Sequence, residues 1–190
     1  KPATVTSYLT EAVVKEIITS GILPEGALQL ICGSAGDMLN YVNSQDVVTF
    51  TGSKYTGLKL KSHPVILGES VPFNMEADSL NCIVLGTDVA PGMPEWDIFI
   101  KEVKKEMTVK AGQKCTAIRR IFVPENKIED VRNALVKELE KTAIGNPANE
   151  KVRMGSLAGL DQRNDVRSQV QKLLAPSQII YGSLDSVAVI

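Results

Sequence analysis

The chain has 190 residues, 21 basic and 22 acidic side chains, one histidine and three cysteines. One histidine and three cysteines are too few for a Cys₄ or Cys₂His₂ zinc site, a HExxH metalloprotease or a multi-disulfide scaffold, so we expect no metal. A net charge of −1 argues against a nucleic-acid partner, and no apolar run approaches the roughly 20 residues of a membrane span, which leaves small-molecule chemistry as the favoured class.

The N-terminal part of the chain alternates between helical and strand-like patterns. Apolar residues recur at helical spacing over 7–20, and Gly21 and Pro24 then supply stop signals. The following elements are expected next: a strand at 28–32, a short helix at 37–42, a strand at 46–50, a helix after Gly52-Ser53, and strands at 64–67 and 71–76.

The C-terminal part continues this alternation. The pattern predicts strands at 80–85 and 118–123, helices at 94–110, 127–141 and 161–174, an extended segment at 178–181 and a buried strand at 186–190. The buried face of the longest helix is expected to carry Trp96, Phe99, Ile100, Val103 and Met107. The helix at 127–141 is expected to start with a capping box of Asn126 and Glu129 and to bury Ile128, Val131, Leu135 and Leu139.

Alternation of this kind predicts an α/β fold with a mostly parallel sheet that helices cover on both faces. The only plausible seam lies near residues 76–80, where a strand-like run ends in polar residues. It separates residues 1–77 from residues 78–190.

Cys115 differs from the other two cysteines in its surroundings. Cys32 and Cys82 lie in apolar strand-like runs, where cysteine usually serves as a small, inert core residue. Cys115 lies in a glycine-containing loop after the longest helix, and positive charge nearby favours the reactive thiolate. Its basic neighbours are Lys114, Arg119 and Arg120. A single loop cysteine is more often incidental than catalytic, so both interpretations stay open.

Glu76 ends the strand-like run 71–76 at the expected seam. Strand ends at a domain boundary commonly hold the chemistry of α/β enzymes, and a carboxylate there can act as a general base. A solvated turn carboxylate paired with lysine is the more common alternative. The single histidine, His63, precedes an apolar run, where a structural or surface role is commoner than a catalytic one.

Two glycine-containing turns are candidates for binding a phosphate. Gly52 and Gly57 flank a turn between a strand and a helix, and Gly33 begins a similar turn at 33–36. Neither turn matches a dinucleotide fingerprint, and the first lacks the Lys-Ser/Thr pair of a P-loop. An ordinary βα turn is the alternative at each position.

Taken in order, five motifs resemble those of the aldehyde dehydrogenase superfamily. They are Lys1-Pro-Ala-Thr4, Gly21-Ile-Leu-Pro-Glu-Gly26, Phe50-Thr-Gly-Ser53 with Gly57, Glu76, and Gly112-Gln-Lys-Cys115. The resemblance spans essentially the whole chain. It implies an aldehyde-dehydrogenase-like α/β fold, with 1–77 as the C-terminal part of the Rossmann-like dinucleotide-binding domain and 78–190 as the N-terminal part of the α/β catalytic domain.

The resemblance also implies roles for single residues. Cys115 would be the nucleophile that adds to the aldehyde, and Glu76 the general base that activates water. The implied cofactor-binding residues are Lys1, Thr4, Gly33, Gly52, Ser53 and Gly57. Thr4 stands where many NAD-preferring members carry a glutamate. Because a neutral residue does not repel a 2′-phosphate, we expect NADP to be accepted and preferred over NAD.

Departures from the family pattern point to a substrate class. Glu76-Ala-Asp-Ser79 replaces the usual Glu-Leu-Gly-Gly, and segments 75–81 and 106–115 resemble the dehydrogenase part of the ring-opening enzymes of bacterial phenylacetate degradation. Those enzymes oxidise a CoA-linked semialdehyde formed by hydrolytic opening of an oxepin-CoA. Semialdehyde dehydrogenases of the benzoyl-CoA epoxidation route share much of the pattern and stay an alternative. The resemblance further implies a cytoplasmic homo-oligomer with a fused hydratase-like domain outside this chain.

The chain is expected to be a fragment that is inactive alone. Two family elements lie outside it: an asparagine that stabilises the oxyanion and a glutamate that holds the nicotinamide ribose. Two other hypotheses stay open, a non-catalytic cofactor-binding relative and a CoA-acylating dehydrogenase. The presence of both Cys115 and Glu76 argues against the first, and Glu76 argues for hydrolysis over transfer to CoA.

Overall fold

The computed structural model describes residues 4–185 and 189–190 of the chain. It divides into two compact units, Lys1–Asp78 and Ser79–Ile190, so that the division falls within the expected seam at 76–80. The two units are described separately below.

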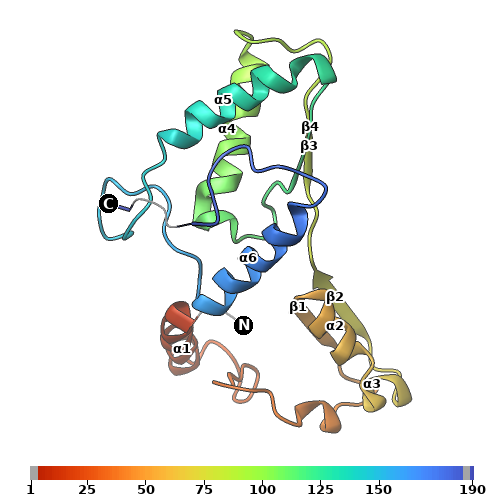
Figure 1. Ribbon diagram of the computed structural model, residues 1–190. Coiled ribbons are helices and arrows are strands. Elements are labelled where there is room, and N and C mark those ends of the chain that lie inside the picture. Colours follow the sequence, from red (N-terminus) through yellow and green to blue (C-terminus); the bar gives the residue numbers. More distant parts are fainter. Residues whose placement is uncertain (1–3, 186–188) are drawn as a thin grey trace. The chain divides into compact units, whose positions relative to one another are not determined.

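The first unit contains one parallel pair of strands. Its elements are α1 (Thr4–Thr19), the 3₁₀ helix η1 (Met38–Tyr41), β1 (Val48–Gly52), α2 (Lys54–Lys61), α3 (Pro64–Gly68) and β2 (Phe73–Ala77). The pairing of β1 with β2 runs in register from Val48 opposite Phe73 to Gly52 opposite Ala77. A parallel pair needs a crossover connection, and α2 and α3 supply it, with α2 packed against both strands (Figure 1).

Residues 64–67 form a helix, so the predicted strand there is wrong. Pro64 occupies the first turn of α3, where its fixed φ suits a helix and its missing N–H costs nothing. His63 is the N-cap, and its Nδ1 accepts a hydrogen bond of 3.3 Å from the N–H of Val65. The single histidine therefore has a structural role in the fold. The local capping signals decided the conformation of this short apolar run.

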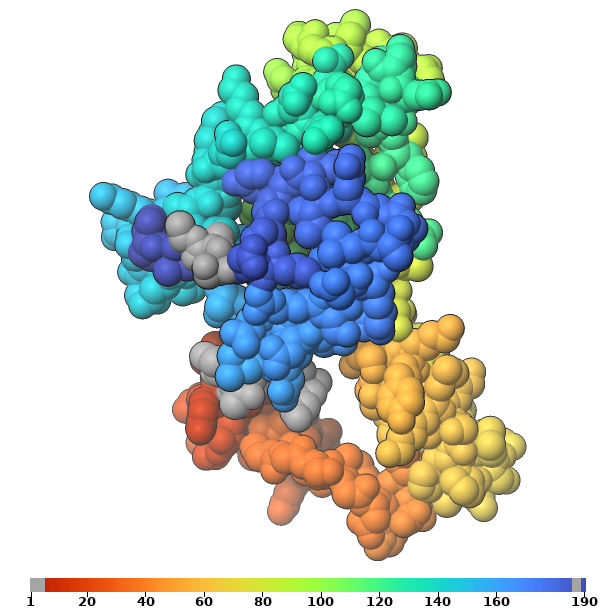
Figure 2. All heavy atoms as spheres, viewed as in Figure 1, coloured from red at the N-terminus to blue at the C-terminus, as the bar shows by residue number. Residues whose placement is uncertain are grey.

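The predicted strand at 28–32 is also wrong. These residues form neither helix nor strand, and all residues from 20 to 38 except Leu28 are exposed. Orange spheres of this part of the chain lie on the visible surface in Figure 2. A strand needs a neighbour to pair with, and β1 is paired only with β2 within the described chain. Cys32 is consequently exposed, which contradicts its predicted place in a core.

The second unit contains another parallel pair and most of the buried core. Its elements are β3 (Cys82–Val84), α4 (Pro94–Thr108), η2 (Val109–Gly112), β4 (Arg120–Phe122), η3 (Glu125–Lys127), α5 (Ile128–Glu140) and α6 (Leu160–Leu173). Cys82 lies opposite Arg120 and Val84 opposite Phe122. The strands are parallel as predicted, but within the described residues they form two separate pairs instead of one sheet. Cys82 is exposed, so its predicted core position is wrong as well.

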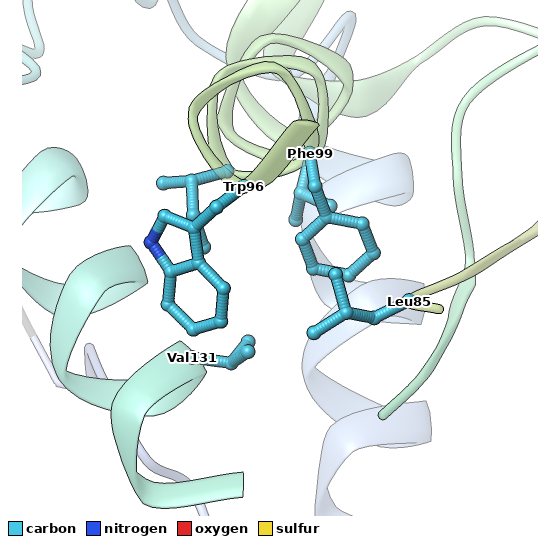
Figure 3. Packing of buried hydrophobic residues seen from close by; sticks show 6 residues of the cluster. Leu85, Trp96, Phe99 and Val131 are labelled. Carbon is cyan, nitrogen blue, oxygen red and sulfur yellow. The ribbon is translucent and has the colours of Figure 1, made fainter. Parts of the chain in front are cut away.

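The buried face of α4 confirms the predicted helical stripe over most of its length. Trp96, Phe99, Ile100 and Val103 are buried, whereas Met107 is 42% exposed and does not belong to the core. In Figure 3 the side chains of Trp96 and Phe99 point from α4 toward Leu85 and Val131. The cluster of Leu85, Trp96, Phe99, Ile100, Val103 and Val131 thus joins α4, α5 and the end of β3.

Three further expectations for the second unit fail wholly or in part. Lys127 is the N-cap of α5 and no side chain caps that helix, because the 3₁₀ turn η3 precedes it and displaces the predicted capping box. Of the predicted α5 stripe, Val131 is buried, Leu135 packs half-buried against the core cluster, and Ile128 is 47% exposed. Residues 178–181 and 189–190 form no strand, and residues 186–188 lie outside the described part. No helix within the described residues is long and apolar enough to cross a membrane.

Candidate active site

Cys115 lies in a loop that reverses direction directly after α4. We call residues 109–119 the Cys115 loop. Lys110, Ala111 and Gly112 have φ values of 53°, 53° and 70°, so three successive residues adopt the left-handed conformation. Glycine does so freely, whereas Lys110 and Ala111 each carry a backbone cost of roughly 1 kcal/mol. Such a turn persists only where surrounding contacts hold it.

An ion pair ties the Cys115 loop to α4. The Nζ of Lys114 lies 2.6 Å from Oε1 of Glu106, and the two side chains are 23% and 12% exposed. Arg119 adds a hydrogen bond of 3.3 Å from its Nη2 to the carbonyl oxygen of Lys114. The ammonium group of Lys114, next to Cys115 in the chain, is therefore held in place by the carboxylate of Glu106, which lies eight residues before Lys114.

Cys115 itself is exposed, and its main chain is held from the start of the second unit. Its carbonyl oxygen accepts hydrogen bonds from the hydroxyl of Ser79 and, at 2.7 Å, from Nδ2 of Asn81. Two residues later, Ala117 is completely buried. A thiol that solvent can reach, on a backbone fixed on both sides, is a suitable arrangement for a nucleophile. The other two cysteines are exposed too, so exposure alone does not distinguish Cys115.

Glu76 lies on β2, beside the turn that follows β1. In the strand register Glu76 is opposite Thr51, and Ala77 is opposite Gly52. Alternation along β2 places Glu76 on the exposed face and Met75 on the half-buried face. Because the carboxyl ends of parallel strands meet at one edge, Glu76, Gly52 and Ser53 are brought together there. This carboxylate is accessible to solvent and can take part in proton transfer.

Ser53 caps the N-terminus of α2. Its hydroxyl oxygen accepts a hydrogen bond of 3.2 Å from the N–H of Thr56, and Ser53 itself remains exposed. The N–H of Lys54 donates to Oδ2 of Asp78 at 3.1 Å. The helix end therefore carries exposed polar groups of the kind that bind anions, with one carboxylate already placed at the same helix end.

Gly57 lies on the opposite side of α2 from the solvent. It is buried, and a Cβ at this position would lie 2.3 Å from Sδ of Met75 and 3.2 Å from Cδ1 of Phe50. The missing side chain allows α2 to approach both strands closely. The structure therefore gives this glycine a packing role, which its spacing in the motif does not reveal.

The remaining candidate residues are not gathered at the Gly52–Ser53 turn by any described contact. Gly33 lies in an exposed turn with φ of 125°, a conformation that favours glycine. Thr4 is the first residue of α1, and Lys1 lies outside the described residues. Glu76 and Cys115 belong to different units, each described by itself.

Sequence reasoning missed Ser79, Asn81 and Glu106. Asn81 and Cys115 are 34 residues apart, and no local periodicity connects them. The one available signal was the departure of Asp78-Ser79 from the Gly-Gly of the family pattern.

Known proteins resemble this chain in both sequence and structure. A model described as "Aldehyde dehydrogenase family" matches residues 1–186. A 3,4-dehydroadipyl-CoA semialdehyde dehydrogenase from Aromatoleum evansii is 42% identical over 182 residues, which cover 96% of this chain and 35% of that protein. A putative aldehyde dehydrogenase from Staphylococcus haemolyticus (strain JCSC1435) is 29% identical and covers 96% of this chain and 38% of its own length.

Solved structures agree with this placement. An aldehyde dehydrogenase C from Pseudomonas syringae, in complex with NAD+ and octanal, has a TM-score of 0.80 at 19% identity and covers 97% of this chain and 37% of its own. A succinic semialdehyde dehydrogenase from Streptococcus pyogenes, in complex with NADP+, has a TM-score of 0.79 at 18% identity, and the match covers 94% of this chain and 38% of that one. These likenesses confirm the predicted aldehyde-dehydrogenase-like α/β fold, and the chain spans about a third of the length of these relatives. The chain belongs to the aldehyde dehydrogenase family.

Proposed function

We propose that the whole protein is an NAD(P)-dependent aldehyde dehydrogenase that oxidises a CoA-linked semialdehyde to the acid, with Cys115 as nucleophile and Glu76 as general base. The family match and the 42% identity to a CoA-semialdehyde dehydrogenase support the activity and the substrate class. The observation that carries the proposal is the exposed thiol of Cys115 on a loop fixed by Ser79, Asn81 and Glu106.

In the first step the thiolate of Cys115 attacks the carbonyl carbon of the aldehyde. A carbon–sulfur bond forms, and the electron pair of the carbonyl π bond moves to the oxygen. The N–H of Cys115 is an oxyanion donor for that oxygen, as the family resemblance implies. The fixed main chain of the Cys115 loop holds the thiol and this N–H in one arrangement throughout the step.

In the second step Glu76 releases the acid. The chemistry that the nicotinamide cofactor supplies, when bound, is acceptance of a hydride from the adduct carbon, which leaves a thioester on Cys115. Glu76 then accepts a proton from water, and the resulting hydroxide attacks the thioester carbon. The carbon–sulfur bond breaks, the acid leaves, the thiolate of Cys115 is restored, and Glu76 gives up its proton to solvent.

The turn at Gly52 and Ser53 fits the diphosphate of a dinucleotide. Both residues are exposed, and the positive end of the α2 dipole favours a negative charge beside them. Asp78 already accepts a hydrogen bond from the N–H of Lys54, so the diphosphate would share this helix end with a carboxylate. We assign cofactor contacts to this turn, to Gly33 and to the N-terminal residues Lys1 and Thr4. The neutral Thr4 supports acceptance of NADP.

Two semialdehydes of different length are candidate substrates. The sequence resemblance favours the phenylacetate route, whose CoA semialdehyde is an eight-carbon dehydrosuberyl derivative. The name of the Aromatoleum evansii relative favours a six-carbon dehydroadipyl-CoA semialdehyde instead. We further propose a homo-oligomer in the cytoplasm, with a fused hydratase-like domain if the eight-carbon route is correct.

Turnover of both CoA semialdehydes by the whole protein, followed as NAD(P)H formation, tests the proposal. Cys115→Ser is expected to abolish formation of NAD(P)H. Glu76→Gln is expected to keep a first-turnover burst and to lower steady-state turnover about 100-fold, because only the hydrolytic step needs the base. Cys32→Ser and Cys82→Ser are matched controls at exposed cysteines and should keep full activity.

Three outcomes of the same assay would contradict parts of the proposal. Full activity of Cys115→Ser would exclude this cysteine as the nucleophile. Release of product only in the presence of free CoA would indicate an acylating dehydrogenase. A kcat/KM for NAD well above that for NADP would overturn the cofactor preference.

A further inference from the structure

Asn81 forms hydrogen bonds with four residues on the C-terminal side of α4. Its Nδ2 donates to the carbonyl oxygens of Cys115 at 2.7 Å and Ala117 at 3.3 Å. Its own carbonyl oxygen accepts from the N–H groups of Arg119 at 2.8 Å and Arg120 at 3.2 Å. Asn81 thus forms hydrogen bonds along the second half of the Cys115 loop, from Cys115 to Arg119, and with Arg120, which follows the loop.

The amide nitrogen of Asn81 carries two hydrogens, and its two shorter contacts are to the carbonyl oxygens of the loop. A third contact, of 3.4 Å, is to the hydroxyl oxygen of Ser79. Ser79 adds a second donor to the carbonyl oxygen of Cys115, and a carbonyl oxygen has two lone pairs. Both lone pairs of the carbonyl oxygen of Cys115 therefore accept hydrogen bonds from side chains, those of Ser79 and Asn81.

Asn81 lies directly before the strand pair of the second unit, so its hydrogen bonds connect the Cys115 loop to that pair. Cys82 follows it directly and begins β3, and Arg120, which donates to Asn81, begins β4. The hydrogen bonds to the Cys115 loop therefore start where the two strands of the second unit first pair. A loop that contains two strained left-handed residues, Lys110 and Ala111, is held by the rigid edge of this pair.

We propose that Asn81, assisted by Ser79, is a positioning residue that fixes the main chain of Cys115 for attack on the aldehyde. Asn81 touches neither substrate nor the reacting sulfur in this role, and it acts through the carbonyl oxygen of Cys115. A displacement of about 1 Å at a reacting group lowers rates by up to about 100-fold, so the geometry held here bears directly on turnover. This inference rests on the proposed function of Cys115.

Three substitutions in the whole protein test the role. Asn81→Ala is expected to lower kcat roughly 10- to 100-fold and to leave the KM for NAD(P) within about twofold, because the contact lies within the second unit. Asn81→Asp keeps the shape but cannot donate to the two carbonyls, so its kcat should fall at least as far. Ser79→Ala removes one of the two donors to Cys115 and should give a smaller loss. Asn133→Ala, at an exposed position on α5, is the matched control and should behave as wild type.

Hydrogen exchange separates a positioning role from a general loss of structure. In Asn81→Ala the amides of residues 113–117 should exchange about tenfold faster, while those of α4 keep their wild-type rates. Equal acceleration in α4 would show a merely structural role and overturn the inference. Wild-type kcat in Asn81→Asp would overturn it as well, because hydrogen-bond donation would then be unnecessary.

The proposed function and this inference fail in different ways. If the wild-type protein forms no NAD(P)H from either CoA semialdehyde, the proposed function fails whatever the variants do. The exchange rates of the Cys115 loop require no turnover, so they decide independently whether Asn81 holds the loop.

Discussion

The Lys114 ammonium and the Glu106 carboxylate form an ion pair that is largely shielded from water. Their side chains are 23% and 12% exposed, and Oε2 of Glu106 has no hydrogen-bond partner among the described residues. Removing one partner of such a pair leaves the other charge desolvated and unpaired, which costs more than the pair contributes. On α4, which also carries Glu106, Lys105 and Glu102 form an exposed pair, at 51% and 39% exposure, in which the hydrogen bond that Lys105 donates to Glu102 raises the pKa of Lys105.

Lys114→Met is therefore expected to lower the free energy of unfolding of the second unit by about 1 to 3 kcal/mol. Lys105→Met, the matched control, should change it by less than about 0.5 kcal/mol, because exposed pairs contribute little. Combining Lys114→Met with Glu106→Gln should recover most of the loss. Urea unfolding followed by the fluorescence of the single tryptophan, Trp96, measures this in the right unit. Equal losses for both lysine variants would contradict the argument.

At the scale of elements, the packing of α2 against β1 and β2 depends on Gly57. Helix propensity alone favours alanine over glycine inside a helix by about 1 kcal/mol. The structure reverses that expectation, because an added Cβ would lie 2.3 Å from Sδ of Met75 and 3.0 Å from its Cγ. The helix would have to move away from the strands to accommodate it.

Gly57→Ala is expected to destabilise the first unit by about 1 to 3 kcal/mol, since overpacking outweighs the gain in propensity. Gly68→Ala at the end of α3 is the matched control: no atom lies within 4 Å of its added Cβ, so stability should change by at most about 0.5 kcal/mol. Urea midpoints from far-ultraviolet circular dichroism compare the two variants. A Gly57→Ala protein more stable than wild type would show that propensity decides.

At the scale of the whole molecule, the apolar side chains of the described residues are divided between the buried cluster of the second unit, two buried residues of the first unit, Ile66 and Val71, and several exposed faces. In α1, Tyr8, Leu9 and Val13 are 76%, 67% and 50% exposed, and in α6 Leu173 is 59% exposed. Helical stripes of this kind are covered in a stable protein by other surfaces. The core around Phe99 is the contrasting case, with that side chain only 5% exposed.

We expect the 190-residue chain alone to bind the apolar dye ANS through these faces. Leu9→Gln should weaken the dye signal and change the free energy of unfolding by less than about 0.5 kcal/mol, whereas Phe99→Ala should cost about 3 to 5 kcal/mol. Glu16→Gln, at an exposed polar position on α1, controls for the substitution itself. A loss of stability in Leu9→Gln comparable to that in Phe99→Ala would mean that α1 is packed in solution.

Local pattern predicted the elements that have strong signals of their own. The apolar stripe of α4 placed Trp96, Phe99, Ile100 and Val103 correctly, because helical periodicity is written in consecutive residues. The same method failed for residues 64–67. Four apolar residues fit a strand or a helix equally well, and the cap at His63 and the ring of Pro64 decided for the helix.

The amino-acid sequence was enough to predict the order of the motifs, most of the alternation of helices and strands, and Cys115 and Glu76 as the candidate residues for chemistry. The folded structure was needed to show which side chains hold the Cys115 loop and that Gly57 has a packing role. Ser79 and Asn81 reach Cys115 across 36 and 34 residues. Hydrogen bonds between residues so far apart in the sequence depend on the tertiary fold, which brings the two segments side by side. A local pattern of residue types carries no information about which distant segments become neighbours.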